Sequence, residues 1–266
     1  MGWKEDVRAR FSPSEDLLRW DGMYAAETEN LEDEFFRLRR DFAVAYVAAH
    51  YGSDARICDL GCGAGPTIAE LLKRGFDTVG FDYSPDMLGK AAKRIGGRRP
   101  LVRCDIQAIP LRDATIDCAV CLGVISYVER YDRILAEIHR ILKPGGTAIV
   151  TYRNDKNLMI SDPVGPVRYL GRKLQRLLGR GGGFRIGNHM SFAEVRRVVA
   201  RSSLTLEGFR GIGFGPLRFN RKPILSERAS LKLHRTLTRW FDRLGAEWPF
   251  RLAADVHILI VRKPPA

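Results

Sequence analysis

The chain has 266 residues, of which 45% are hydrophobic, and it carries a formal net charge of +13. This length fits one large α/β domain, or a domain with a modest cap, and the composition can build an ordinary buried core. No window of about 18 apolar residues occurs, which argues against a membrane-spanning helix. The N-terminus is charged throughout and lacks the apolar core of a signal peptide, so a cytoplasmic location is expected.

The basic charge is concentrated in the C-terminal part of the chain. Residues 1–152 hold 21 Lys and Arg against 23 Asp and Glu, a net charge of −2. Residues 153–266 hold 23 against 8, a net charge of +15. The whole basic excess therefore belongs to one region, and it bears on what that region contacts.

All five cysteines lie between Cys58 and Cys121. An odd number in so short a stretch does not form a dispersed disulfide framework, so we expect reduced thiols packed as small apolar side chains. Cys118 and Cys121 form a CxxC pair, which is also a pattern of metal and redox sites. In a strand, however, residues three apart point to opposite faces. Core packing is therefore the expected role, and no metal site is predicted.

From residue 56 onward, short β-branched apolar runs alternate with helical patterns, which is typical of βαβ units. Strands are predicted at 56–60, 78–82, 101–105, 116–122 and 147–152. The helices between them are predicted at 67–74, 85–94 and 131–142. The last helix is followed by KPGG (143–146), a helix stop ahead of the next strand. Five strands in this rhythm indicate a parallel sheet covered by helices on both faces.

The remaining elements are less regular. Residues 191–202 are predicted to form a helix, with Ser191 as N-cap and Glu194 completing a capping box. Residues 204–214 and 256–262 are predicted to be the sixth and seventh strands. Segments around 163–188 and 215–250 interrupt the pattern, and a helical, charged segment occupies the first 50 residues.

A glycine-rich turn, DLGCGAGP (59–66), follows the first strand. Glycines let the backbone turn sharply and approach a ligand where a Cβ would collide. The spacing is GxGxG, whereas dinucleotide-binding turns have GxGxxG. Pro66 also removes one of the helix-start N–H groups that would hold a phosphate. The turn therefore favours a ligand without phosphate.

Acidic residues end the next two predicted strands. Asp82 lies 19 residues after Gly63, where a carboxylate can accept from both ribose hydroxyls. Asp105 ends the third predicted strand, where it can accept from an adenine amino group while the N–H of Ile106 binds the ring. The carboxyl ends of adjacent parallel strands form one crevice, so we expect Asp59, Asp82 and Asp105 to converge. Each one alone could equally cap a helix or turn.

Five successive segments, DLGCGAG, GFDYSPDML, CDIQAIPL, DCAVCLGVISYV and ILKPGGTAIV, are similar to the motifs of class I S-adenosylmethionine-dependent methyltransferases. Within that family the chain resembles small-molecule enzymes of the ubiquinone and menaquinone methyltransferase type. The resemblance covers residues 50–152 well and 190–214 loosely. It implies a Rossmann-like α/β fold, with a mostly parallel seven-stranded sheet whose last strand is antiparallel, helices on both faces and helical cap insertions.

The resemblance also assigns roles to residues. Asp59 and the loop residues Gly61, Cys62 and Gly63 would hold the methionine portion of S-adenosylmethionine, and Asp82 would hold its ribose. The remaining cofactor residues are expected around the adenine and at the methyl-transfer position: Tyr83, Met87, Asp105, Ile106, Leu122, Gly123 and Tyr127.

The expected organisation is a single methyltransferase domain over residues 1–266. Residues 1–50 form an N-terminal helical cap and 51–152 the cofactor-binding half. Residues 191–214 and 253–266 complete the sheet. Basic amphipathic insertions at 153–190 and 215–252 leave the carboxyl edge of the sheet, so they are expected to cover the acceptor site.

The catalytic base is not fixed by the sequence. An electrophilic methyl group chiefly needs an aligned nucleophile, and a base is required only where the acceptor loses a proton. His189, on a glycine-rich connection before the sixth-strand unit, is the first candidate, although a surface or capping role is the commoner one for such a histidine. Tyr127 is the second, and it could simply contact the cofactor. His257, in the apolar seventh strand, is expected in the core or at its rim.

The two insertions carry leucines on one helical face and basic residues around it. Most such faces are buried against their own domain. If they instead cover the acceptor, an anionic or amphiphilic small molecule is expected, met at an anionic membrane surface by peripheral contact. An RNA methyltransferase is the main alternative, because +15 over this region suits phosphate binding, although no RNA-binding module is recognisable. A non-catalytic, S-adenosylmethionine-binding regulatory protein is the second alternative.

Overall fold

A seven-stranded sheet forms the centre of the fold in the computed structural model, in the order β3-β2-β1-β4-β5-β9-β6. The structure describes residues 30–97, 100–128, 130–154, 190–219, 222–244 and 254–265, with isolated positions between 164 and 178. His189 and residues 1–29 of the predicted cap lie outside the described residues. The strands are β1 (Arg56–Leu60), β2 (Asp77–Asp82), β3 (Leu101–Arg103), β4 (Ile116–Cys121), β5 (Leu142–Arg153), β6 (Thr205–Ile212) and β9 (Val256–Arg262).

The pairing of these strands confirms the predicted fold. Strands β1 to β5 pair in parallel, whereas β9 lies antiparallel between β5 and β6. The last strand of the chain therefore inserts into the sheet rather than extending its edge. In a sheet covered on both sides such strands read as continuous apolar runs, and β1, β4 and β9 are almost entirely buried.

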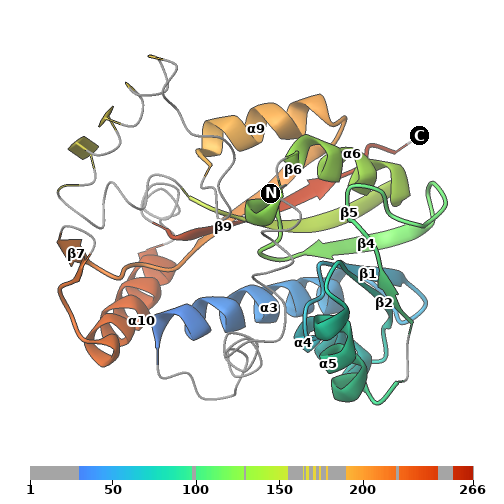
Figure 1. Cartoon of the computed structure of the whole chain (residues 1–266), viewed down its shortest axis with the longest axis horizontal. Coiled ribbons are helices and arrows are strands. Elements are labelled where there is room, and N and C mark those ends of the chain that lie inside the picture. The colour runs from blue at the N-terminus through green and yellow to red at the C-terminus, as the bar shows by residue number, and fades with distance from the viewer. Residues whose placement is uncertain are drawn as a thin grey trace.

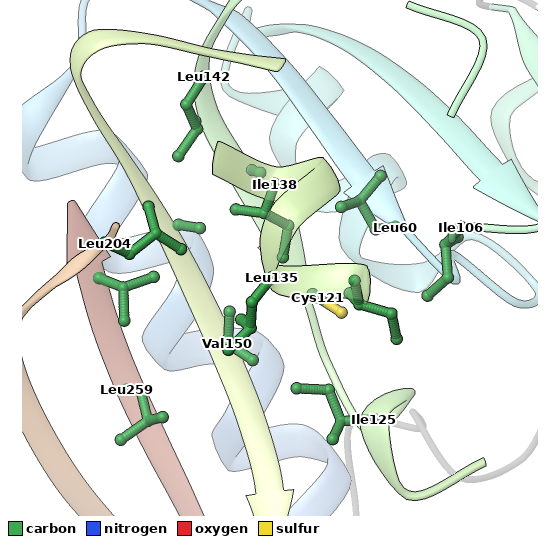
Figure 2. Close-up of a cluster of buried hydrophobic side chains, with 14 of the residues drawn as sticks. Leu60, Ile106, Cys121, Ile125, Leu135, Ile138, Leu142, Val150, Leu204 and Leu259 are labelled. Atoms are coloured by element: carbon green, nitrogen blue, oxygen red, sulfur yellow. The ribbon is translucent and has the colours of Figure 1, made fainter. Parts of the chain in front are cut away.

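Helices cover both faces of the sheet (Figure 1). One face carries α3 (Leu31–His50), α4 (Pro66–Lys73), α5 (Pro85–Ile95) and α10 (Glu227–Leu244), and the other carries α6 (Tyr131–Ile141) and α9 (Phe192–Arg201). Figure 2 shows Leu135 and Ile138 of α6 packed over Cys121 and Val150 of the sheet, in a core in which each of these side chains is buried. Within the described residues, no helix combines the length and apolar character needed to cross a bilayer.

Local capping explains where several helices begin. The capping box of α9 is present as predicted, because Ser191 Oγ accepts from the Glu194 N–H (3.2 Å) and Glu194 Oε2 accepts from the Ser191 N–H (2.9 Å). Ser84 caps α5 in the same way by accepting from the Met87 N–H (3.3 Å). Such side chains replace the missing carbonyl partners of the first helical turn.

Some predicted boundaries were wrong. Strand β3 ends at Arg103, because Asp105 turns the chain away, as described below. The KPGG segment lies inside β5, which already begins at Leu142, because Gly145 and Gly146 pair with the end of β9 at Lys263. A short hairpin of β7 (Arg218–Phe219) and β8 (Lys222–Pro223) was not predicted, since two-residue strands are too short to show a period.

The CxxC pair lies in the core, as predicted. Cys118 packs toward α3 and Cys121 toward α6, on opposite faces of β4. Both are free, fully buried thiols, and burial raises the pKa of each to about 12. His257 is also in the core, where its Nδ1 lies 2.6 Å from the Tyr152 hydroxyl.

Polar contacts hold helix α10 against α3 and against the segment that follows β6. His234, only 1% exposed, accepts a hydrogen bond on Nδ1 from the Phe214 N–H (3.1 Å), so its ring is neutral. Arg235 lies beside it and pairs with the buried Glu34 of α3 at 3.1 Å. Burial lowers the pKa of His234 to about 4, because a charged ring there would lose its hydration and that accepted bond. This contact holds the second predicted insertion against the body of the protein.

Candidate active site

The glycine-rich turn after β1 is held against β2. The N–H groups of Gly61 and Cys62 both donate to the Phe81 carbonyl, at 2.7 and 2.9 Å. A Cβ on Gly61 would collide with the Val124 side chain, so this position requires glycine. Gly63, at φ +53°, has no heavy atom within 4 Å of where its Cβ would stand. The turn therefore presents bare backbone to open space at the carboxyl edge of the sheet.

Asp82, at the end of β2, fixes this turn. Its Oδ2 accepts from the Gly63 N–H and its Oδ1 accepts from the Ser84 N–H, both at 2.8 Å. Burial raises the pKa of this carboxyl in spite of these bonds. A carboxylate has about four acceptor positions, and these backbone N–H groups do not fill all of them, so Asp82 can still accept from a ligand hydroxyl.

Asp59 differs from Asp82 in its surroundings. It lies on β1 next to the turn, it is 2% exposed, and no group of the described residues donates a hydrogen bond to it. Burial, with the nearby Asp82 carboxyl, raises the pKa of Asp59 to about 8. A buried carboxyl is costly unless a donor or a cation accompanies it. The site therefore has a built-in preference for a ligand with positive charge or N–H groups.

Asp105 lies two residues beyond β3, rather than at its end as predicted. Its Oδ1 accepts from the backbone N–H of Gln107 (3.0 Å), and its carbonyl accepts from Ala108 (2.9 Å), which closes a turn. The local bond of an aspartate competes with strand pairing, and this explains the short strand. Cys104 still donates to the Asp82 carbonyl (3.1 Å), so Asp105 stays beside Asp82. The Ile106 N–H makes no hydrogen bond to any described residue, while its side chain is buried.

Tyr83 and Met87 follow Asp82 along the same edge. Met87, in the first turn of α5, is buried. Tyr83 is partly buried, its carbonyl accepts from Arg103 Nε (3.3 Å), and the Arg103 guanidinium lies 6.0 Å from its ring centre. Both residues thus flank Asp82: Met87 is a packed side chain, and Tyr83 is a partly exposed ring.

The end of β4 forms the other border of the site. Leu122 is partly buried toward α3, and Gly123, at φ +76°, donates its N–H to Thr151 Oγ1 (2.6 Å). Tyr127 closes the short 3₁₀ helix η1 (Ile125–Tyr127) and is partly buried. The structure thus gathers all the predicted cofactor residues along the carboxyl ends of β1, β2, β3 and β4, while His189 is not among the described residues.

Two residues of this border were missed by the sequence reasoning. Arg39 of α3 is buried, and its Nη1 would lie 2.9 Å from a Cβ on Gly123. Thr151 of β5 holds Gly123 from the opposite side. Neither carries a local signal, because each reaches Gly123 only through the packing of another element against β4.

Comparison with known proteins bears on this arrangement. Residues 58–150, about a third of the chain, match the family described as "Methyltransferase domain". A ubiquinone biosynthesis O-methyltransferase of Methylococcus capsulatus is 29% identical over 178 residues, covering 65% of this chain and 73% of that protein. A demethylmenaquinone methyltransferase of Deinococcus radiodurans is 32% identical over 116 residues, or 42% of this chain and 47% of that protein. The chain is a class I S-adenosylmethionine-dependent methyltransferase.

The fold of this methyltransferase also has solved counterparts. The magnesium protoporphyrin IX methyltransferase of Synechocystis, with bound S-adenosylhomocysteine, superposes with a TM-score of 0.64 at 16% identity. The match covers 98% of this chain and all of that one, so the likeness of fold extends well beyond residues 58–150. At this identity the likeness concerns the fold alone, and the acceptor is a separate question.

Proposed function

We propose that this methyltransferase acts on a small-molecule acceptor that is anionic or amphiphilic, and that it holds S-adenosylmethionine along the carboxyl ends of β1 to β4. The observation that supports the placement of the cofactor is Asp59, a buried carboxyl to which no described residue donates, beside the bare backbone of Gly63. A cationic ligand without phosphate meets both conditions. The residues present therefore fit the group.

The turn after β1 would hold the methionine portion. Asp59 would accept from the α-amino group, and the backbone of Gly61, Cys62 and Gly63 would border the chain of the ligand. Asp82 can still accept from a ligand beyond its bonds to Gly63 and Ser84, which suits a ribose hydroxyl. Because Asp82 also holds the turn itself, it couples the position of the ribose site to that of the methionine site.

The adenine would lie between the elements that follow β2 and β3. Met87 and Tyr83 offer an apolar side chain and a ring on one side. On the other side, Asp105 can accept from the amino group and the available Ile106 N–H can donate to the ring. The Asp105 carboxylate as acceptor and the neighbouring Ile106 N–H as donor match the amino group and the ring nitrogen at the edge of an adenine.

Methyl transfer would occur at the end of β4, where the bound cofactor supplies a methyl group on a sulfonium. Leu122, Gly123 and Tyr127 would border the acceptor, and Arg39 with α3 would exclude water from it. The bond from Gly123 to Thr151 fixes the backbone, so the chain's contribution is alignment. For an acceptor that loses a proton, His189 and Tyr127 remain the proposed bases.

Two arginines at this edge support an anionic acceptor. Arg39 is buried against Gly123, and Arg153, half-buried at the end of β5, lies within electrostatic reach of Tyr127 while pairing with Asp255 (3.2 Å). A buried guanidinium favours a carboxylate or phosphate nearby. The insertions at 153–190 and 215–252 would cover this acceptor, and the packing of α10 on α3 fits that role. The free thiols suit a reducing, cytoplasmic location.

A pair of glycine variants tests the cofactor site. Gly63 and Gly75 both have positive φ, and neither has an atom within 4 Å of its missing Cβ. Gly63→Ala and Gly75→Ala should therefore cost similar stability, about 1 kcal/mol. Calorimetry with S-adenosylhomocysteine should show binding lost only in Gly63→Ala. Equal binding by both variants would place the cofactor elsewhere.

The acceptor class needs a separate experiment. The purified enzyme is incubated with a cell extract and S-adenosylmethionine labelled in the methyl group, and the extract is divided into small molecules and RNA. Label in small molecules that bind an anion exchanger is the expected result. Label in RNA, favoured only by the +15 charge of residues 153–266, would support the RNA alternative. Tight cofactor binding with label in neither fraction would support the regulatory alternative.

A further inference from the structure

Large apolar side chains are exposed in one part of the protein only. Among the described residues, every exposed large hydrophobic side chain lies between positions 167 and 240, with exposed fractions from 40% to 71%. They are Val167, Leu170, Leu174, Leu178, Leu217, Phe219, Ile224 and Trp240. Single exposed leucines are ordinary, whereas a group of eight in one region marks an interaction surface.

These residues come from three segments at one end of the molecule. Val167, Leu170 and Leu174 are helical positions, and the Leu178 N–H donates to the Leu174 carbonyl (3.0 Å), so their spacing of three and four puts them on one helical face. The expectation that this face is buried against its own domain was therefore wrong for the positions described. In Figure 1 this segment, the β7–β8 hairpin and α10 all lie toward the left end of the long axis.

The other two segments lie at the same end of the molecule (Figure 1). In the hairpin, the Ile224 N–H donates to the Leu217 carbonyl (2.9 Å), which brings two exposed apolar residues to facing positions. Helix α10 packs on α3 through Ser230, Leu231 and His234, all buried, while Trp240, 55% exposed, lies outside that contact. The face that α10 uses for packing is thus not the one that carries the tryptophan. We call the eight exposed residues named above the apolar end.

Basic residues accompany the apolar end. Residues 164–178 contain four Lys and Arg and no Asp or Glu, and residues 217–244 contain eight against two. Among those described, Lys222, Arg228, Lys232 and Arg239 are exposed. A second copy of this chain would bring the same positive charge, and RNA would leave the leucines uncovered. An anionic bilayer matches both features, because it takes up apolar side chains at the headgroup boundary and attracts basic ones.

We propose that the apolar end docks the enzyme reversibly on an anionic phospholipid surface. This docking requires neither cofactor nor acceptor, so it stands independently of the proposed acceptor class. The first of its three segments follows β5 in the chain, and Arg153, the last residue of β5, borders the proposed acceptor position. An enzyme docked in this way would be held at the bilayer, where an amphiphilic substrate is concentrated.

Vesicle co-sedimentation with the full chain tests this proposal. The enzyme should sediment with vesicles that contain phosphatidylglycerol, not with pure phosphatidylcholine, and high salt should release it. The double variant Leu170→Gln/Leu174→Gln should bind about tenfold more weakly or worse, because it removes two side chains from the interface. Lys232→Glu/Arg239→Glu should weaken binding and reduce its salt dependence.

Matched controls separate docking from folding and from catalysis. Lys73→Glu/Lys93→Glu changes two exposed lysines by the same charge on α4 and α5, away from the apolar end, and should bind vesicles as the wild type does. The leucine variant should keep its melting temperature and its affinity for S-adenosylhomocysteine. Conversely, Asp59→Asn should lose the cofactor and still sediment. Equal sedimentation of the wild type and the leucine variant, or no sedimentation with anionic vesicles at low salt, would overturn the proposal.

Discussion

Residues 30–154 and residues 167–240 of this methyltransferase differ in how far their large apolar side chains are exposed. In the described residues from 30 to 154 none of these side chains is exposed, and the region has nearly balanced charge. From 167 to 240 eight are exposed, within a strongly basic segment. The first region uses its apolar residues to pack a sheet against helices. The second has more than its own packing needs, and this excess is the physical signature of a surface that meets something else.

The largest expected effect lies in the first region, at Asp59. Asp59→Asn should weaken S-adenosylhomocysteine binding about tenfold to a hundredfold, because a hydrogen bond to a charged group contributes about 1.5–3 kcal/mol. Folding raises the pKa of Asp59 from 3.8 to about 8, so its cost to stability is absent below pH 3.8 and grows as the pH rises toward 8. The variant should therefore be at least as stable as the wild type at neutral pH. Calorimetry measures the binding and thermal melts measure the stability. A variant that is destabilised but still binds S-adenosylhomocysteine would show that Asp59 supports the fold and not the cofactor.

The contact of α10 with the segment that follows β6 should be sensitive to acid. Folding lowers the pKa of His234 from 6.5 to about 4, so the unfolded chain takes up a proton first. Stability should be complete above pH 6.5 and fall as the pH drops toward 4, by about 3 kcal/mol in all. His234→Asn keeps an acceptor for the Phe214 N–H and cannot be protonated in this range. Urea denaturation between pH 7 and 4 should give a flatter profile for this variant, and identical profiles would show that other groups dominate.

Gly123 tests the border of the first region. Gly123→Ala adds a Cβ at positive φ, which costs about 1–2 kcal/mol, and this Cβ also meets Arg39 Nη1 at 2.9 Å. Gly145→Ala is the matched control, because Gly145 has φ +78° and open space around it. Gly145→Ala should lose about 1–2 kcal/mol in thermal melts and Gly123→Ala at least as much, because only the latter also displaces Arg39, whereas turnover should fall only in Gly123→Ala. Loss of turnover in both would point to general destabilisation.

The smallest expected effect concerns the N-terminus of helix α9. Ser191→Ala removes the side chain that accepts from Glu194 and should lower the unfolding free energy by about 1 kcal/mol. Cofactor affinity should not change, because α9 packs on α6 and β6, away from the glycine-rich turn. Ser191→Asp, which restores a cap, should recover most of the loss in urea denaturation. Failure of that recovery would mean that the cap is not what the serine contributes.

The sequence by itself determined the order of the βαβ units, the glycine turn and the acids around it, because each follows from spacing within a few residues. DLGCGAG places Asp59 beside Gly61 and Gly63, and Ser191 and Glu194 cap their helix without outside help. A local hydrogen bond also explains why the predicted end of β3 was wrong. The Gln107 N–H donates to the Asp105 carboxylate and forms a turn, so the strand ends at Arg103, earlier than its apolar pattern predicted.

Only the tertiary structure decided which distant residues meet. The insertion of β9 between β5 and β6, the approach of Arg39 to Gly123 and the contact of His234 with Phe214 all join elements far apart in the chain. Likewise, the spacing of Leu170, Leu174 and Leu178 predicts an ordinary amphipathic face, and only their exposure in the fold distinguishes a docking surface from a packed one. A period in the sequence reports that a face is apolar, whereas the free energy of burying it depends on whether another element is there to cover it.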